Sequence, residues 1–494
     1  MTATSTSTMS DRLSGQRVDH VVLALLVAGA AALRLLYLGQ PMRNDEAYSY
    51  LYFALPSLRT AVSDYTLPNN HVFHTVLVWA ATRLFGTSPE AIRLPVLIAG
   101  VLAVPSAWLA ARSLADRRAG LFAAAAVAAL PALALYSTNA RGYMLIGLAT
   151  LLLVWLGVRL LDAERLWQWA AIVIIGALGM WTAPVMLYPL GAVSLWLLVE
   201  HVRTQGARGA APFAVRLAVA MALIAALTAL LYLPVIVHAG AASLTQNRFV
   251  KPLTLPAMAG QAESFLRGMR ELIGLGLSRI EVVLALVVAS LGIAAPGEHR
   301  ARRVTLALTT AIWCSALVLI TRRPPPPRVL LFLAPLLCLY LGIGLSWLVA
   351  RAKLDRPPVS AFAALLLFAV IAVQVVRTRA VLESEETDWI GIRDARAVAE
   401  LVAAGRGDER IVINRSSGPP VDYYLYHITG QRLSHFTDAQ RRGPILLVLD
   451  ERHHQTTERV LPLHPDVPWS TLGAPRLLKR FPGVSVYAYS AATP

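Results

Sequence analysis

The sequence predicts an α-helical membrane protein with many transmembrane spans, followed by a small soluble α/β domain. The composition is the first reason, because 56% of the 494 residues are hydrophobic and only 15% are charged. The second reason is that several stretches of about 20 residues carry almost no charge, and such a helix spans roughly 30 Å of hydrocarbon. The third is a change after Arg377, where short β-rich runs alternate with helical ones. These features exclude a disordered chain, a disulfide-rich scaffold and an ordinary cytosolic enzyme.

The apolar runs predict about eleven spans. These runs are 20–38, 94–111, 119–137, 142–161, 166–181, 184–200, 216–238, 278–295, 304–321, 328–349 and 358–376. A further run, 71–85, is short and carries His71, His74 and Arg83, so we expect an interfacial helix there. The predicted domains are therefore a transmembrane domain, 1–379, with a first external loop at 39–93, and an extracytoplasmic domain, 380–494.

The net charge of +16 is explained by topology. The Arg residues fall in short loops between apolar runs, and cytoplasmic loops are enriched in Lys and Arg, so we expect no nucleic-acid partner. With 71–85 at the interface, the most basic loops and the N-terminus lie in the cytoplasm. The loops 138–141, 239–277 and 322–327 then lie outside. If 71–85 spans instead, every later loop changes sides.

The first external loop opens with two adjacent acids, Asp45 and Glu46. A carboxylate at the water–lipid boundary can act as a general base on a hydroxyl or amine. The same residues are also common at a solvated helix N-terminus, where they interact favourably with the helix dipole. Both interpretations are open from the spacing alone.

Further along this loop, Asn70 and His71 can donate hydrogen bonds without full charge, which suits a sugar hydroxyl or a phosphate oxygen. Alternatively, Asn70 caps an amphipathic interfacial helix. His71 and His74 have the i, i+3 spacing of a zinc pair, but no third ligand is evident nearby. No metal and no cofactor is therefore expected.

Five basic residues are predicted to lie outside, where positive charge needs a reason: Arg141, Arg248, Lys251, Arg322 and Arg323. Arg141, followed by Tyr143, lies in a short loop between two spans, and Arg322, Arg323 and Arg328 flank the stiff segment Pro324–Pro327. The planar guanidinium pairs well with phosphate. Contact with lipid headgroups and a rigid linker are the alternative interpretations. The segment containing Arg248 and Lys251 offers weaker cationic candidates.

Several signatures of other membrane proteins and hydrolases are missing. The sequence has no G-x-x-x-x-G-K-[ST], G-x-S-x-G or H-E-x-x-H motif, which disfavours an ATP-driven pump and a zinc protease. Few acids lie in the middle of the apolar runs, which disfavours a proton-coupled transporter.

The ordered set of motifs resembles the integral-membrane GT-C glycosyltransferases. The most similar branch is the bacterial one related to the protein O-mannosyltransferases and the lipid A aminoarabinose transferase. The matching stretches are Asp45-Glu46-Ala47-Tyr48, Leu84-Phe85-Gly86 with Arg93-Leu94-Pro95, Tyr136-Ser137 with Ala140-Arg141-Gly142-Tyr143, Pro327-Arg328-Val329-Leu330-Leu331 with Pro335, and Asp422-Tyr423-Tyr424 in the soluble tail.

The resemblance implies an inverting enzyme with an isoprenoid-phosphate sugar donor, working on the outer face of the membrane. It implies that Asp45 is the general base, that Glu46 supports it, and that Arg141 holds the lipid phosphate. The lipid A branch has Lys-Pro-Pro-Leu where this chain has Pro68-Asn69-Asn70-His71, and Arg-Pro-Asp where it has Arg141-Gly142-Tyr143. These departures argue against aminoarabinose and lipid A as donor and acceptor.

The sequence thus predicts a glycosyltransferase of the bacterial inner membrane, with its active site on the periplasmic face. Its expected partners are a polyprenyl-phosphate sugar, a glycan, lipid or protein acceptor, and membrane lipids. Asp45 and Glu46 are the predicted catalytic residues. The predicted phosphate-binding residues are Arg141, Arg322, Arg323, Arg328, Asn70, His71 and Tyr143. The alternatives are a lipid-linked glycan flippase without transfer chemistry, and a membrane scaffold whose external domain binds a partner.

Overall fold

The computed structural model describes residues 3–490 except 246–249, 355, 378–391, 393, 406, 415–416, 439–440, 442, 452–453 and 468. The described chain forms two compact units. The first contains Met1–Leu38, Ala61–Val78 and Arg93–Leu382, and the second contains Gly39–Thr60, Trp79–Ile92 and Glu383–Pro494. Because the second unit combines 39–60 and 79–92 with the C-terminal residues, parts of the first external loop pack with the C-terminal domain. The expected domain boundary at 379/380 and the candidate cation Arg248 lie outside the described residues.

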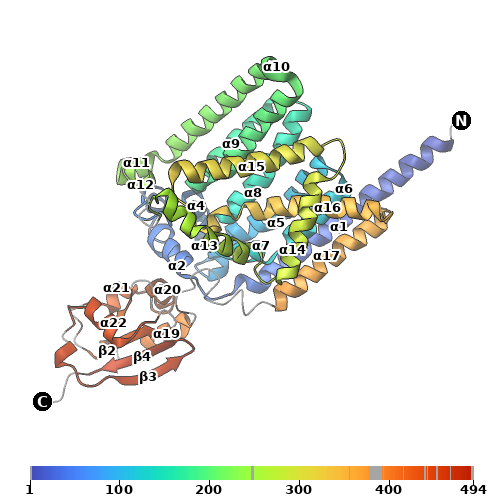
Figure 1. Ribbon diagram of the computed structural model, residues 1–494. Helices are drawn as coiled ribbons and strands as arrows, with labels where there is room; N and C mark the ends of the chain where they lie inside the picture. Colours follow the sequence, from blue (N-terminus) through green and yellow to red (C-terminus); the bar gives the residue numbers. More distant parts are fainter. Residues whose placement is uncertain are drawn as a thin grey trace. The chain divides into compact units, whose positions relative to one another are not determined.

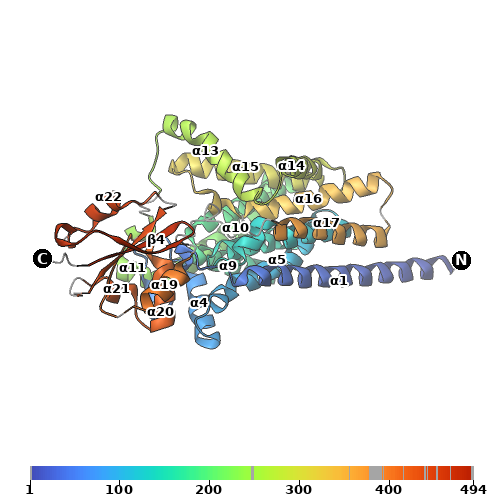
Figure 2. The ribbon, with the colours of Figure 1, turned by 90° about the horizontal axis from the view of Figure 1, so that it is seen from below.

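The helices of the transmembrane region follow the apolar runs closely (Figure 1). They are α1 (Ala3–Leu38), α4 (Val72–Phe85), α5 (Pro89–Leu114), α6 (Arg117–Ala129), α7 (Pro131–Tyr136), α8 (Tyr143–Asp162), α9 (Leu166–Thr182), α10 (Leu187–Leu231), α11 (Leu233–Ala239), α12 (Ala242–Thr245), α13 (Leu255–Ile273), α14 (Arg279–Ala294), α15 (Arg300–Thr321), α16 (Leu333–Arg351) and α17 (Pro357–Arg377). Figure 2 shows α17 beside α1, against which it packs.

Six helical stretches in the described chain are long and apolar enough to cross a membrane. They are Gln16–Leu38, Pro89–Leu114, Tyr143–Asp162, Pro184–Leu231, Arg300–Thr321 and Leu333–Arg351. The helical membrane architecture is therefore confirmed, while the number of about eleven crossings stays a prediction. The helix α4 has 14 residues, or about 21 Å at 1.5 Å per residue, which is shorter than the hydrocarbon layer.

The expected span 119–137 is not one helix, because it breaks at Leu130, just before Pro131. Proline has no N–H, so the carbonyl of Val127 has no donor four residues ahead. Arg34 of α1 supplies the missing donors: its Nη2 bonds the carbonyl of Val127 at 3.2 Å, and its Nη1 bonds that of Ala128 at 2.7 Å. This arginine is fully buried. A buried charge inside the bundle therefore completes a helix that the sequence interrupts.

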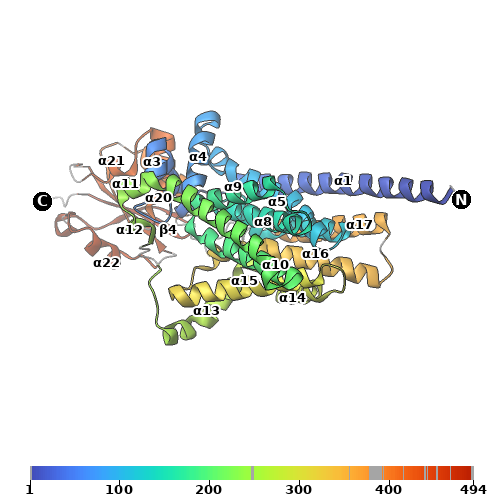
Figure 3. The same ribbon diagram turned by 90° about the horizontal axis from the view of Figure 1, so that it is seen from above.

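The helix α10 joins two of the expected spans. Gly206 has φ 69° and ψ 168°, which is not helical, and the helix doubles back there (Figure 1). The left-handed region suits glycine because it has no Cβ. The two arms pack beside α9 and α15 (Figure 3).

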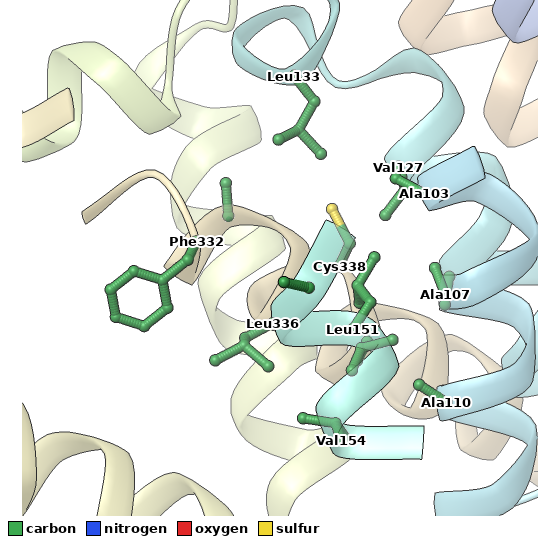
Figure 4. Close-up of a cluster of buried hydrophobic side chains, with 14 of the residues drawn as sticks. Ala103, Ala107, Ala110, Val127, Leu133, Leu151, Val154, Phe332, Leu336 and Cys338 are labelled. Atoms are coloured by element: carbon green, nitrogen blue, oxygen red, sulfur yellow. The ribbon is translucent and has the colours of Figure 1, made fainter. Parts of the chain in front are cut away.

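Small residues bring the other helices close together. A Cβ on Gly342 of α16 would lie 2.5 Å from the backbone nitrogen of Ala123 in α6, so only glycine fits this crossing. Figure 4 shows part of the surrounding core, where Ala107 and Ala110 of α5 point toward Leu151 and Val154 of α8. The thiol of Cys338 is also buried there, whereas Cys314 is only partly buried, and both are free.

The second unit contains a four-stranded sheet of order β1-β2-β4-β3. Its strands are β1 (Arg410–Ile413), β2 (Ile445–Asp450), β3 (Arg476–Phe481) and β4 (Val484–Tyr489). β1 and β2 are parallel and the other pairs are antiparallel. The described helices of the tail are α19 (Ala395–Ala403), α20 (Gly418–Thr429), α21 (Leu433–Phe436) and α22 (Thr457–Val460). The α/β character predicted for the tail is confirmed.

The loop segments that join this unit also contain helices. They are α2 (Asn44–Ser49), the π-helix η1 (Tyr50–Ala54) and α3 (Leu58–Ser63), of which only the first three residues lie in the unit. Helix α2 packs against α20. The acidic motif is therefore supported by the C-terminal domain.

Candidate functional site

The loop between α7 and α8 is buried in the first unit. Arg141 is only 4% exposed, and Thr138 is fully buried. The loop is short because α7 ends at Tyr136 and α8 begins at Tyr143. A short buried loop restricts where the guanidinium of Arg141 can lie. An arginine that only reaches toward mobile lipid headgroups does not need such a restriction.

Arg141 lies in a cluster of polar groups from two segments far apart in the sequence. Its Nη1 donates to Oδ1 of Asn69, and its Nη2 lies 3.5 Å from both Nε2 of His71 and Oη of Tyr143. The rings of His71 and Tyr143 meet edge to face, with centroids 4.9 Å apart. We call Asn69, His71, Arg141 and Tyr143 the arginine cluster. The structure thus brings together three of the residues predicted from the sequence.

The hydrogen bonds of His71 fix where its proton lies. Nδ1 accepts the backbone N–H of Gly142 at 2.8 Å, so a neutral ring carries its proton on Nε2. Burial lowers the pKa of His71 well below its ordinary value, and the nearby Arg141, His74 and Arg328 lower it further. The ring is therefore neutral, and its Nε2–H approaches another donor, Nη2 of Arg141. Two donors that converge in this way suit an anionic acceptor placed between them.

Gly142 is required by this arrangement. A Cβ there would lie 2.4 Å from Cγ2 of Thr182 and 2.8 Å from Nδ1 of His71. Proline at this position would remove the N–H that His71 accepts. The sequence motif contained Gly142, but nothing in its spacing indicated that its backbone would orient His71.

Asn70 forms hydrogen bonds with its own segment, and its predicted part in phosphate binding stays a prediction. Its Nδ2 donates to the carbonyls of Ala61 at 3.0 Å and Asp64 at 2.6 Å, and its Oδ1 accepts from Thr75 at 2.7 Å. The side chain is completely buried. Asn70 therefore ties the loop to the start of α4, while its neighbour Asn69, which the sequence did not single out, contacts Arg141.

The other predicted cations lie around the Pro324–Pro327 segment. Arg328 belongs to the 3-10 turn η3 (Pro327–Leu330), is partly buried, and acts electrostatically on His71. Arg322 is exposed and ends α15 with φ 52°, and its carbonyl accepts from Leu253 at 2.8 Å. Arg323 is partly buried. Phosphate binding by Arg322, Arg323 and Arg328 stays a prediction.

The acidic motif belongs to the second unit. The two carboxylates of α2 have different environments. Glu46 is completely buried, and its Oε1 accepts the backbone N–H of Arg43 at 2.8 Å. Asp45 is partly exposed. Glu46 therefore caps its own helix, and Asp45 is the more exposed carboxylate of this pair.

The C-terminal domain contacts the acidic segment through residues of α20. Oη of Tyr424 accepts the backbone N–H of Met42 at 3.2 Å, and Oη of Tyr423 donates to the carbonyl of Thr87 at 2.8 Å. The ring of Tyr423 also meets that of Tyr50 edge to face. The motif Asp422-Tyr423-Tyr424, known only as part of a resemblance, thus has a structural role.

The zinc interpretation of His71 and His74 gains no support from this geometry. No group of three or more His, Cys, Asp or Glu suited to a metal was found among the described residues. His71 faces the Arg141 guanidinium, whose charge favours an anion over a metal cation.

Comparison with known proteins agrees with this fold. Residues 71–239 match the model of the family described as dolichyl-phosphate-mannose-protein mannosyltransferase. A search of curated proteins gave no match. ArnT from Cupriavidus metallidurans bound to undecaprenyl phosphate is 14% identical with a TM-score of 0.61, over 94% of this chain and 97% of that chain. The apo form of that protein gives a TM-score of 0.62 at 15% identity, with the same coverage.

An archaeal protein has a similar architecture. The oligosaccharyltransferase AglB from Archaeoglobus fulgidus, in complex with an inhibitory peptide and a dolichol-phosphate, is 15% identical with a TM-score of 0.50. The match covers 88% of this chain and 70% of that chain. ArnT and AglB are GT-C glycosyltransferases. The chain is therefore a multi-pass membrane protein with the GT-C fold, and the resemblance to that superfamily predicted from its ordered motifs is confirmed.

Proposed function

We propose that this protein transfers a sugar from a polyprenyl-phosphate donor to an acceptor outside the cytoplasm, with inversion at the anomeric carbon. The hydroxyl or amine of the acceptor loses its proton to Asp45 and attacks the anomeric carbon. The bond from that carbon to the phosphate oxygen breaks, and polyprenyl phosphate leaves with the electron pair. Because attack comes from the face opposite the leaving group, the configuration inverts.

The convergence of donors in the arginine cluster is the observation that carries this proposal. Nη2 of Arg141 and Nε2–H of His71 approach each other at 3.5 Å, and Tyr143 adds a hydroxyl at the same distance from Nη2. A phosphate oxygen can accept from all three. Such donors also stabilise the negative charge that develops on the leaving phosphate.

An apolar cavity in the first unit suits the isoprenoid chain of the donor. Its volume is about 790 Å³, and it is lined by α9, both arms of α10, and Trp313 of α15. At one end, Tyr232 packs in a small cluster with Tyr65 and Val72, and Val72 follows His71 directly. Through Tyr232, the lining of the cavity is therefore in contact with the segment that follows His71.

Related proteins support the donor class. The structures of ArnT and AglB hold undecaprenyl phosphate and dolichol-phosphate respectively, and the matching family model is described by its dolichyl-phosphate-mannose donor. All three names contain a polyprenyl phosphate, which is the common feature we carry to this chain.

The decisive experiment measures turnover. Membranes with and without the protein are supplied with the bacterium's own lipid-linked sugars, and free polyprenyl phosphate and envelope glycans are followed by mass spectrometry. A transferase generates free polyprenyl phosphate together with a newly glycosylated acceptor. A flippase moves the lipid-linked sugar but leaves it intact, and that result would overturn the proposal.

The face of the membrane on which transfer occurs has its own test. We expect loop 112–118 to be cytoplasmic, and loops 138–141 and 322–327 to be external. Single cysteines at Arg117 and Arg323, in a chain without Cys314 and Cys338, are treated with a membrane-impermeant thiol reagent. Labelling at 323 and not at 117 is expected. The opposite pattern would make 71–85 a span and move the site to the cytoplasmic face.

A further inference from the structure

The segment that follows the acidic motif has an unusual break in its backbone hydrogen bonds. Residues Tyr50–Ala54 form a π-helix, in which the N–H of Leu55 bonds the carbonyl of Tyr50 at 2.7 Å. In an α-helix that N–H would bond the carbonyl of Leu51. The next possible donor is position 56, which is proline and has no N–H. The helix itself therefore leaves the Leu51 carbonyl without its usual donors.

A side chain of the C-terminal domain takes over this carbonyl. Nη1 of Arg432 donates to the oxygen of Leu51 at 3.1 Å, across 381 positions of the sequence. The same guanidinium lies over the ring of Tyr52, 4.7 Å from its centroid. Arg432 thus bonds the backbone and covers an aromatic ring on one turn of the π-helix.

Asp422 holds the guanidinium in place. Its Oδ2 accepts from Nη2 of Arg432 at 2.7 Å, and its Oδ1 accepts from Nε at 2.9 Å. Oδ1 also accepts the backbone N–H of Leu433 at 2.7 Å. The side chain of Asp422 is only 4% exposed. A bidentate pair of this kind fixes the plane of the guanidinium and not only its charge.

The contact continues to the helix that carries the proposed base. The ring of Tyr52 stacks on that of Tyr48, with centroids 4.3 Å apart and planes inclined by 17°. Tyr48 belongs to α2 and lies three residues after Asp45, so the two side chains share a face of this helix. Arg432, Tyr52 and Tyr48 form a continuous stack that ends on the face of α2 that carries Asp45.

We propose that Arg432, oriented by Asp422, is a positioning residue for sugar transfer: it completes the π-helix at Leu51 and thereby sets the direction in which α2 presents Asp45. The proposal rests on the assignment of Asp45 as the base. It gives the C-terminal domain a defined part in the reaction, through a contact with the backbone of the acidic segment.

The first test is local and does not depend on turnover. Amide hydrogen exchange is measured on the full chain in lipid nanodiscs, for the wild type and for Arg432→Met. Losing the donor leaves a polar carbonyl unsatisfied, so exchange in residues 44–55 should rise roughly tenfold. Exchange in strands β1, β2 and β4 should not change. Faster exchange through the whole sheet would mean that Arg432 only stabilises the domain, and unchanged exchange in 44–55 would also overturn the proposal.

The matched control is Arg441→Met. Arg441 has the same kind of contacts in the same domain, because it donates to the carbonyls of Gly407 and Glu409 and lies over the ring of Phe436. Its loss should leave exchange in 44–55 unchanged. Asp422→Asn should reproduce the effect of Arg432→Met, and the double variant should add little to either.

The second test uses turnover, measured as polyprenyl phosphate released from lipid-linked sugars. Arg432→Met should lower kcat on the order of tenfold while binding of undecaprenyl phosphate stays within twofold, because the donor site is intact. Arg432→Lys should recover part of the loss, since an ammonium reaches fewer acceptors than the guanidinium fork. Wild-type turnover in Arg432→Met would overturn the positioning role. If the wild type releases no polyprenyl phosphate, the proposed function fails. The hydrogen-exchange result still decides whether Arg432 stabilises the segment 44–55.

Discussion

The arginine cluster and the acidic segment differ in how they are built. The cluster draws Asn69 and His71 from the loop before α4. Arg141 and Tyr143, about 70 positions away, come from the loop before α8 and from the first residue of that helix, and the donors approach each other at 3.5 Å. The acidic segment is local: Glu46 is bonded to Arg43 only three residues earlier, at 2.8 Å. One region brings buried donors from two segments together, whereas the other closes its own hydrogen bonds and leaves Asp45 as its more exposed carboxylate.

This difference indicates a division of labour. Converging donors are suited to hold an anion whose charge grows as a bond breaks. A closed helix turn with one accessible carboxylate is suited to accept a proton from a defined direction. Substitutions in the first region should therefore change binding, and those in the second should change turnover.

The largest effect is expected for Asp45→Asn. The change is nearly isosteric, but an amide cannot accept the acceptor's proton, so kcat should fall about 10²–10⁴-fold. Binding of undecaprenyl phosphate should remain. Glu46→Gln should cost much less turnover, because an amide oxygen can still accept the N–H of Arg43. Kinetic assays of both variants decide between them: loss in Glu46→Gln with near wild-type turnover in Asp45→Asn would reverse the two roles.

Arg141→Ala should have the next largest effect, and on binding. A hydrogen bond to a charged group contributes about 1.5–3 kcal/mol, which corresponds to a loss of roughly ten- to a hundredfold in affinity for undecaprenyl phosphate. Arg141→Lys should lose less, because it keeps the charge but not the planar fork. Titration with the lipid phosphate in nanodiscs measures this, and an unchanged affinity in the alanine variant would reassign Arg141 to contact with headgroups.

Gly142→Ala should lower the affinity for undecaprenyl phosphate less than Arg141→Ala does, and a second substitution should restore part of that affinity. The added Cβ would collide with Cγ2 of Thr182 and with His71, and such overpacking typically costs about 1–3 kcal/mol. We expect a severalfold weaker affinity for undecaprenyl phosphate. Thr182→Ser removes the methyl group and keeps the hydroxyl, so the double variant should recover part of the affinity. No recovery would mean that displacement of His71, and not crowding at Thr182, causes the loss.

The smallest expected effect is on how the thermal stability of the protein depends on pH. His71 has a lowered pKa, so the folded protein keeps the ring neutral while the unfolded chain takes up a proton below about pH 6.5. Its contribution to stability is therefore complete above that pH and decreases as the pH falls below it. Thermal unfolding between pH 8 and 5 should show this decline, and His71→Gln should make it shallower. A slope identical to that of the wild type would show that His71 already titrates normally.

The residues at the two departures from the lipid A branch contact one another in the structure. His71 stands where that branch has leucine, and Gly142 where it has proline, and the two are joined by a hydrogen bond of 2.8 Å. Asn69 and Tyr143, which replace a proline and an acid, both lie against Arg141. In this chain a neutral histidine, an amide and a phenol therefore surround the arginine.

Several site residues could be predicted from the sequence and several could not. Arg141, His71 and Tyr143 stood out because polar residues were placed beside predicted spans. Asn69, Gly142 and Arg432 did not, since their roles depend on backbone groups that one sequence does not place. Asn70 and Glu46 were also predicted to take part in the reaction, and the structure shows hydrogen bonds from each to its own segment; their part in the reaction stays a prediction.

The sequence by itself determined the membrane architecture and the α/β tail, because hydrophobic periodicity and composition are local properties of the chain. It also marked where helices must break, since Pro56 and Pro131 lack the N–H that a continuous helix needs. Only the tertiary structure decided how those breaks are satisfied. Arg432 reaches Leu51 across 381 positions, and Arg34 reaches Val127 across 93. Unsatisfied backbone groups are costly when buried, so the fold must supply a donor, but any segment can supply it, and no local pattern tells which.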